Sequence, residues 1–135
     1  MERLEARVSV ARKALNTFLD LAGPVGYAIR PSSERRDAAI QRFEYSFEAV
    51  WKAVQLYLSQ EEALSIGSPK GCIRASREVG FLDESEAETA LKMADARNLT
   101  AHTYDEGVAN SLYEHLPAYA ASLDLWLGKV EKSLQ

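Results

Sequence analysis

Apolar residues recur along most of the chain at alternating spacings of three and four, which places side chains on one face of an α-helix. The first such stripe ends before Gly23-Pro24 and consists of Leu4, Val8, Ala11, Leu15, Phe18 and Ala22. A second, wider stripe consists of Ile40, Phe43, Phe47, Val50, Trp51, Val54 and Leu58. The last consists of Leu112, Leu116, Tyr119, Leu123, Trp126, Val130 and Leu134. The pattern predicts helices and indicates no strand.

Glycine, proline and serine residues predict where the first three helices begin and end. Residues 23–33 contain two prolines and two glycines, which is typical of a loop, and Ser33 is a plausible N-cap for the second helix. Ser68 and Pro69 suit the start of a short third helix of about three turns. Gly80 suits its left-handed C-terminal cap.

A fourth helix should open at Asp83-Glu84-Ser85-Glu86, which is typical of a capping box. This helix should fray near His102, because Asp105-Glu106-Gly107 is turn-like, and a last helix should begin around Val108. Pro117 removes a backbone hydrogen bond and should kink the last helix or split it in two. The prediction is an all-α, antiparallel up-and-down bundle of four long helices and one short helix.

Composition limits the function classes. With 135 residues and 47% hydrophobic content, the chain suits one domain over residues 1–135. No apolar run approaches the roughly 18 residues that span a bilayer, and the start lacks the apolar core of a signal peptide, so we expect a cytoplasmic protein without a membrane partner. The single cysteine, Cys72, is expected to pack as a small buried side chain. Two histidines and no cysteine cluster imply no metal.

The segment Arg97-Asn98-Leu99-Thr100-Ala101-His102-Thr103-Tyr104 gathers a fixed cation, an amide, an imidazole and a phenol, which are groups suited to handling a phosphodiester. Arg97 and His102 lie about 140° apart on an ideal helix, so one straight helix cannot aim both at the same atom. Either the helix unwinds near His102, or a second copy of the chain completes the site across a two-fold axis.

The spacing of Arg97, His102 and Tyr104 resembles the signature of the HEPN superfamily, in its HepT-type or nucleotidyltransferase substrate-binding branch. The segments 42–52 and 68–74 also resemble that branch. The resemblance implies a helical bundle that cleaves RNA as a homodimer without metal or cofactor, with the site at the dimer interface. In it, His102 would be the catalytic base or acid, Arg97 the catalytic phosphate-binding partner, and Asn98 a polar supporter.

The resemblance also implies a separately encoded partner. In HepT-type pairs a small nucleotidyltransferase, acting as the antitoxin, attaches AMP to the tyrosine that Tyr104 matches and silences the toxin. An adenylated phenol would place charge and bulk beside Arg97 and His102. The alternative is a non-enzymatic accessory subunit that presents a nucleotide or substrate to the nucleotidyltransferase.

Structural roles compete with these assignments. His102 could cap helix carbonyls, and Arg97 could pair with Asp95 or Glu106. Lys70 and Arg74 could contact RNA or the partner, or form a solvated helix face. The four-residue spacing of Glu44, Glu48 and Lys52 allows ion pairs along the second helix. The net charge of −4 argues against charge-driven binding of long nucleic acid, so any RNA contact should be local.

Overall fold

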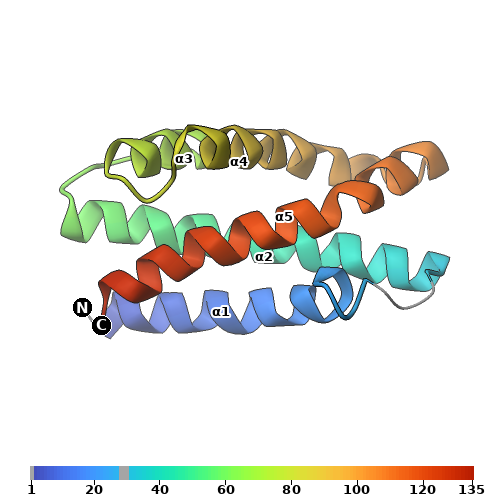
Figure 1. The fold of residues 1–135 in the computed structure, drawn as a ribbon, viewed down its shortest axis with the longest axis horizontal. Coiled ribbons are helices and arrows are strands. Elements are labelled where there is room, and N and C mark those ends of the chain that lie inside the picture. Colours follow the sequence, from blue (N-terminus) through green and yellow to red (C-terminus); the bar gives the residue numbers. More distant parts are fainter. Residues whose placement is uncertain (1, 28–30) are drawn as a thin grey trace.

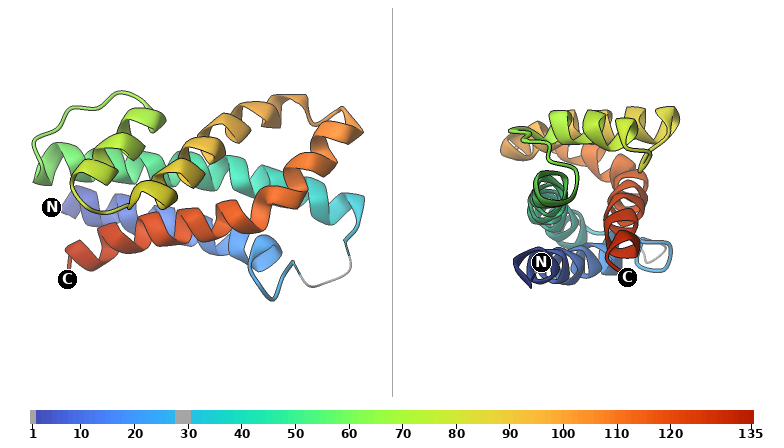
Figure 2. Two further views of the ribbon diagram at one scale, coloured as in Figure 1. Left: turned by 45° about the horizontal axis from the view of Figure 1, so that its top comes forward. Right: turned by 90° about the vertical axis from the view of Figure 1, so that its left-hand side faces the viewer.

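The computed structural model describes residues 2–27 and 31–135. The elements are α1 (Glu2–Ala22), α2 (Ser33–Glu61), α3 (Pro69–Glu78), α4 (Glu84–Arg97), the 3₁₀ helix η1 (Asn98–His102) and α5 (Glu106–Ser133). The described part of the chain contains no strand, which confirms the expected all-α bundle. In Figures 1 and 2, α2 and α5 lie in the middle, with α1 on one side and the shorter α3 and α4 on the other.

The predicted apolar stripes form the core. Every residue of the first two stripes is buried, and so is every residue of the last except Leu134, which is partly buried. Small residues of α4 (Ala87, Ala90 and Ala94) are buried as well. Burial of these faces against one another is what holds the helices together, because a single amphipathic helix is only marginally stable in water.

The predicted caps of α3 and α4 are present. The Ser68 hydroxyl accepts a hydrogen bond from the Gly71 amide, and Gly80 has a φ of +87°. Asp83 and Glu86 bond each other's backbone amides reciprocally, which is the capping box. The N-cap of α2 is Ser32 and not Ser33, because Ser32 has the extended backbone that lets its hydroxyl accept from the Arg35 amide.

The last helix begins earlier than predicted, and of the two effects expected of Pro117 it shows the bend and not the split. It begins at Glu106, since the Asp105 carboxylate caps it by accepting from the amides of Gly107 and Val108. Pro117 does not split the helix, which continues to Ser133 and bends in its first half (Figure 2). The loop expected over residues 23–33 falls partly on residues 28–30, which lie outside the described residues.

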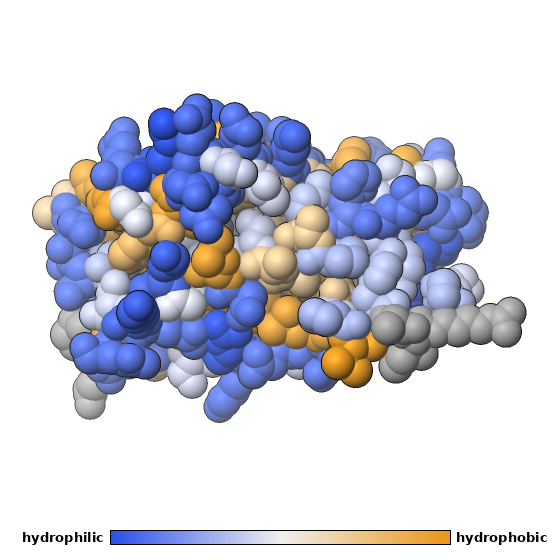
Figure 3. Space-filling model, viewed as in Figure 1, coloured by the Kyte–Doolittle hydropathy of each residue, from blue (hydrophilic) through white to orange (hydrophobic). Residues whose placement is uncertain are grey.

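Ion pairs join α5 to the other long helices. Arg12 of α1 donates to Asp124 at 2.7 Å and to Glu131 at 2.6 Å, and Arg36 of α2 donates to Glu106 at 2.8 Å. Hydrophilic side chains cover most of the face in Figure 3, and apolar side chains gather between α1 and the bend of α5. An apolar cavity of about 420 Å³ lies there, lined in part by Leu19 and Pro117.

Two further properties agree with the sequence. Cys72 is completely buried, and its burial raises the pKa of the thiol to about 11, so it serves packing and stays protonated at neutral pH. None of the helices described here combines the length and the apolar character needed to cross a membrane.

Candidate functional site

The Arg97–Tyr104 segment changes helix type in its middle. The α-helix α4 ends at Arg97, and the chain then tightens into η1, where the buried Thr100 hydroxyl donates to the Arg97 carbonyl at 2.8 Å. A 3₁₀ helix turns by about 120° per residue, so the side chains after Arg97 point in different directions from those an α-helix would give them. The α-helix therefore ends before His102 by tightening into a 3₁₀ helix, which differs from the unwinding that was the first of the two expected alternatives.

Arg97 points toward α2. Its Nε donates to Glu48 Oε1 at 3.1 Å, its Nη2 lies 4.0 Å from Glu44 Oε1, and 29% of the side chain remains exposed. The pairing expected with Asp95 or Glu106 is wrong, because Asp95 binds Lys70 and Glu106 binds Arg36. One guanidinium edge is therefore occupied by carboxylates of another helix.

Glu48 is a site residue that the sequence did not single out. While its Oε1 accepts from Arg97, its Oε2 accepts from the indole Nε1 of the buried Trp51 at 3.1 Å. The packed indole holds the carboxylate, and the carboxylate orients the guanidinium. The ion pair expected between Glu48 and Lys52 is absent from the described part of the chain. Local spacing could not reveal the pairing with Arg97, since the two residues are 49 positions apart.

The other motif residues face solvent. Asn98 and His102 are exposed, and Tyr104 is 84% exposed. The rings of His102 and Tyr104 meet edge to face, with their centroids 6.1 Å apart. Among the described residues, the His102 ring has no hydrogen bond, so it does not cap helix carbonyls. Both rings are free to meet a ligand.

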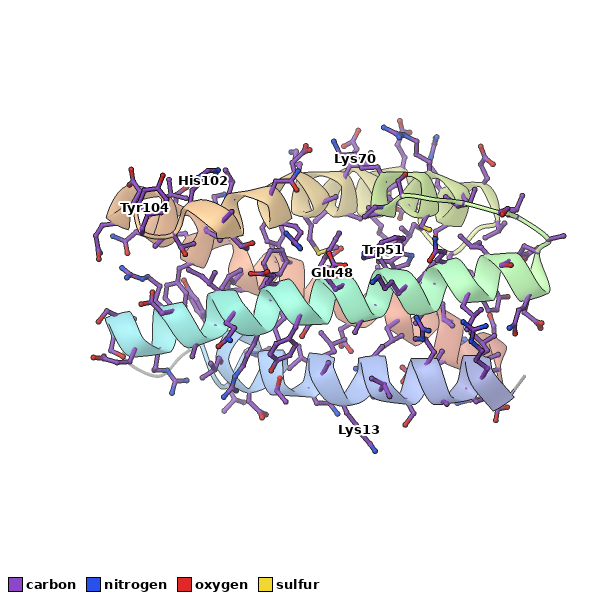
Figure 4. The ribbon with its side chains drawn as sticks, turned by 180° about the vertical axis from the view of Figure 1, so that it is seen from behind. Lys13, Glu48, Trp51, Lys70, His102 and Tyr104 are labelled. Atoms are coloured by element: carbon purple, nitrogen blue, oxygen red, sulfur yellow. The ribbon has the colours of Figure 1, made fainter. Side chains whose placement is uncertain are left out.

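A single chain thus divides the motif into two groups. In Figure 4, His102 and Tyr104 lie together beyond the end of α4, whereas Glu48, which binds Arg97, lies midway along α2. The first group offers a proton-transfer group and a phenol to solvent. The second offers a cation whose charge is already offset by Glu44 and Glu48.

Lys70 and Arg74 of α3 are in acidic surroundings. Lys70 forms an ion pair with Asp95 at 2.5 Å. Arg74 is exposed and lines a cavity of about 310 Å³ together with Glu78, Glu84 and Glu88. Carboxylates in such positions repel phosphate, so neither Lys70 nor Arg74 offers it an unneutralised positive charge.

Comparison with known proteins matches the chain to a family model and to solved structures. Residues 6–132 match the model of a family described as nucleotidyltransferase substrate binding protein like. The crystal structure of a protein from Thermus thermophilus is similar to this chain, with 52% sequence identity, coverage of 87% of this chain and 96% of that one, and a TM-score of 0.81. No curated protein matches the chain.

Proposed function

This chain belongs to the family of nucleotidyltransferase substrate-binding-like proteins, and from that premise we propose that it is a HepT-like, metal-independent ribonuclease of the HEPN superfamily. It acts as a homodimer and as the toxin of a two-component pair. A small nucleotidyltransferase silences it by attaching AMP to Tyr104. The observation that carries the proposal is the exposure of the His102 and Tyr104 rings side by side at the end of α4.

The residue types supply the chemistry of RNA cleavage. RNA carries its own nucleophile, the 2′-hydroxyl, so the protein needs a base, an acid for the leaving 5′-oxygen and a cation for the developing negative charge. His102 is the base or acid, because an imidazole ring can both accept and donate a proton. Arg97 binds the phosphate, and Asn98 supports it through its exposed amide.

A second copy of the chain would bring the two groups of motif residues together. Within one chain, Arg97 is turned toward α2 and His102 toward solvent. A two-fold dimer presents the same surface twice, so the His102 of one protomer can meet the Arg97 of its partner and two imidazoles become available for the two proton transfers. RNA phosphate then has to compete with Glu48 and Glu44 for the guanidinium.

The position of Tyr104 suits regulation by modification. A phenol with 84% of its surface exposed is open to a transferase site, and its ring already contacts the His102 ring. AMP on the Tyr104 oxygen would place a phosphate charge and an adenosine beside the imidazole. Substrate phosphate would then be excluded from the site by repulsion and by volume.

RNA cleavage by purified, unmodified protein in the presence of a chelator tests the ribonuclease. We expect cleavage by the wild-type chain and a loss of about 10²- to 10⁴-fold in Arg97→Ala and in His102→Ala, the range typical of general acid–base groups. Arg74→Ala removes an exposed arginine outside the motif and should retain activity. Size-exclusion chromatography checks that each variant remains a folded dimer. Intact RNA with the unmodified wild-type protein would contradict the proposal.

The second candidate is a non-enzymatic accessory subunit that presents a nucleotide or another substrate to the nucleotidyltransferase. The description of the family favours it. Glu44 and Glu48 also favour it, because they offset the positive charge of Arg97 that a nuclease would use to bind phosphate. This subunit would bind the transferase with a dependence on Tyr104 or Arg97 while leaving RNA intact under every condition.

Co-expression with a small nucleotidyltransferase separates the two candidates. Mass spectrometry should find one added AMP on the wild-type chain and none on Tyr104→Phe, which keeps the ring and removes the acceptor oxygen. Cleavage should return in Tyr104→Phe despite the transferase. A stable complex with no AMP transfer and no cleavage would support the accessory subunit.

A further inference from the structure

A basic pocket lies away from Tyr104, between the first turns of α1 and the C-terminal half of α2. Its volume is about 270 Å³, and the polar residues that line it are Arg3, Arg7, Lys52, Gln55, Ser59 and Ser65. None of its described lining residues is acidic. Three cations and two hydroxyls therefore surround one opening on a chain whose net charge is −4.

The end of α2 shapes one wall of this pocket. Ala63 has a φ of +55°, and the Leu64 amide donates to the Leu58 carbonyl at 2.9 Å, so the chain turns back over the helix it has just left. The Gln55 side chain then donates to the Ile66 carbonyl at 2.7 Å and holds the returning segment in place. This turn brings Ser65 to the same opening as the cations of α1.

No carboxylate neutralises the three cations of the pocket among the side chains that the structure describes. Arg3, Arg7 and Lys52 form no ion pair with any acidic side chain that the structure describes, whereas Arg12 and Arg36 each bind two carboxylates. The carboxylate that could have neutralised Lys52 from one turn away, that of Glu48, is held by Arg97 and Trp51. Three like charges around one cavity repel one another and create a local positive potential.

The lining chemistry matches phosphate groups. Arginine offers a planar fork to phosphate oxygens, lysine adds a mobile point charge, and serine hydroxyls donate single hydrogen bonds. No aromatic ring is present among the described lining residues, so nothing there stacks on a base. The pocket, with a volume of about 270 Å³, is open to solvent and has room for more than one phosphate.

We propose that this pocket binds linked phosphates, whether or not the chain cleaves RNA. Two sources share that chemistry: the polyphosphate tail of a nucleotide and the backbone of an RNA strand. Their contacts with the pocket are the same, because the cations recognise phosphate oxygens and make no use of the base.

Isothermal titration of the full chain with tripolyphosphate, ATP and a short 2′-O-methyl RNA tests the proposal. The RNA is 2′-O-methylated because it then lacks the nucleophile for cleavage. Removing one charged contact should weaken binding roughly tenfold in Arg7→Ala and in Lys52→Ala. The matched control is Lys13→Ala, which removes one charge from the exposed surface of α1 (Figure 4) and should bind like the wild type. If the two pocket variants bind tripolyphosphate and ATP more weakly than the wild type but bind the RNA equally well, the phosphates come from a nucleotide. If only their binding of the RNA is weakened, the phosphates come from a strand.

Thermal unfolding supplies a readout that a purely structural role would not produce. Without ligand, Lys52→Ala should be at least as stable as the wild type, because it removes one of three repelling charges. Tripolyphosphate should raise the Tm of the wild type, and of Lys13→Ala by the same amount, but raise that of Lys52→Ala less. If Arg7→Ala fails to fold, Lys52→Gln takes its place. Equal binding by wild type and pocket variants, or an equal loss in Lys13→Ala, would overturn the proposal.

Discussion

Ser76 in α3 and Tyr104 after η1 are opposite cases of a side chain outside its usual environment. Ser76 is polar and completely buried, yet its hydroxyl donates to the Cys72 carbonyl at 2.7 Å and accepts from the Trp126 indole at 2.9 Å. Tyr104 is a large aromatic residue that is 84% exposed. The buried polar group is fully satisfied, whereas the exposed ring loses contact area that a core position would have given it.

The surroundings of the two residues show the same difference. Around Ser76, the side chains of Cys72, Ile73 and Trp126 are all fully buried. Around Tyr104, His102 is exposed and Leu99 is 46% exposed. Packing therefore explains Ser76 and its neighbours, and it leaves the exposed side chains of Leu99, His102 and Tyr104 unexplained. A region whose residues do little for the fold is where a function is best sought.

The largest expected effect belongs to the α3 contact. Trp126→Ala should lower the free energy of unfolding by about 3–5 kcal/mol, because it removes a completely buried indole and leaves a cavity. Ser76→Ala should lower it by about 1–3 kcal/mol, since the indole N–H loses its only acceptor in the described structure. Urea denaturation followed by circular dichroism measures both. A loss under about 1 kcal/mol for Trp126→Ala would show that α3 is not part of the cooperative core.

An intermediate effect is expected at Glu48, whose side chain is neither fully buried like Ser76 nor exposed like Tyr104. Glu48→Gln should lower the free energy of unfolding by up to about 1 kcal/mol, because the pair with Arg97 is partly exposed and the amide oxygen can still accept from Trp51. The control is Glu44→Gln, whose oxygen lies 4.0 Å from the guanidinium and should matter less. The same denaturation experiment measures both variants. A larger loss for Glu44→Gln than for Glu48→Gln would reverse their order of importance.

The smallest effect on stability is expected at the exposed rings. His102→Ala and Tyr104→Ala should each change the free energy of unfolding by about 0.5 kcal/mol or less, because neither side chain is packed in the core. Thermal melts of both variants beside the wild type provide the measurement. A loss above about 1 kcal/mol in either one would mean that the end of α4 is structural after all, and the contrast with α3 would disappear.

Much of the fold could be predicted because its signals are local. The spacing of Leu4 to Ala22 defines the buried face of α1, and the capping box at Asp83 and Glu86 satisfies backbone amides within one turn. The N-cap of α2 lies one residue before the predicted position, because Ser32 and Ser33 are equivalent in sequence and only the backbone conformation distinguishes them. Which of two neighbouring serines becomes the N-cap depends on the backbone conformation in which the preceding chain enters the helix.

The candidate site could be predicted only in part, for a geometric reason. The residue types between Arg97 and Tyr104 indicate phosphodiester chemistry, and their spacing indicates that a straight helix cannot bring them together. The position of each ring and the role of Glu48 depend on contacts between helices. In the sequence, Glu48 has the pattern of a surface residue with a helical neighbour, and its actual partner comes from α4.

By itself, the sequence determined which faces of the helices are apolar, where most of them start and stop, and which residue types gather after α4, since these properties arise from the periodicity of the backbone and from groups within one turn of one another. Only the tertiary structure decided that Arg97 turns to Glu48, that Lys70 turns to Asp95, and that the unpaired cations of α1 and α2 share one pocket. The physical reason is that a charge is attracted by whichever opposite charge packing brings near, whatever their separation along the chain.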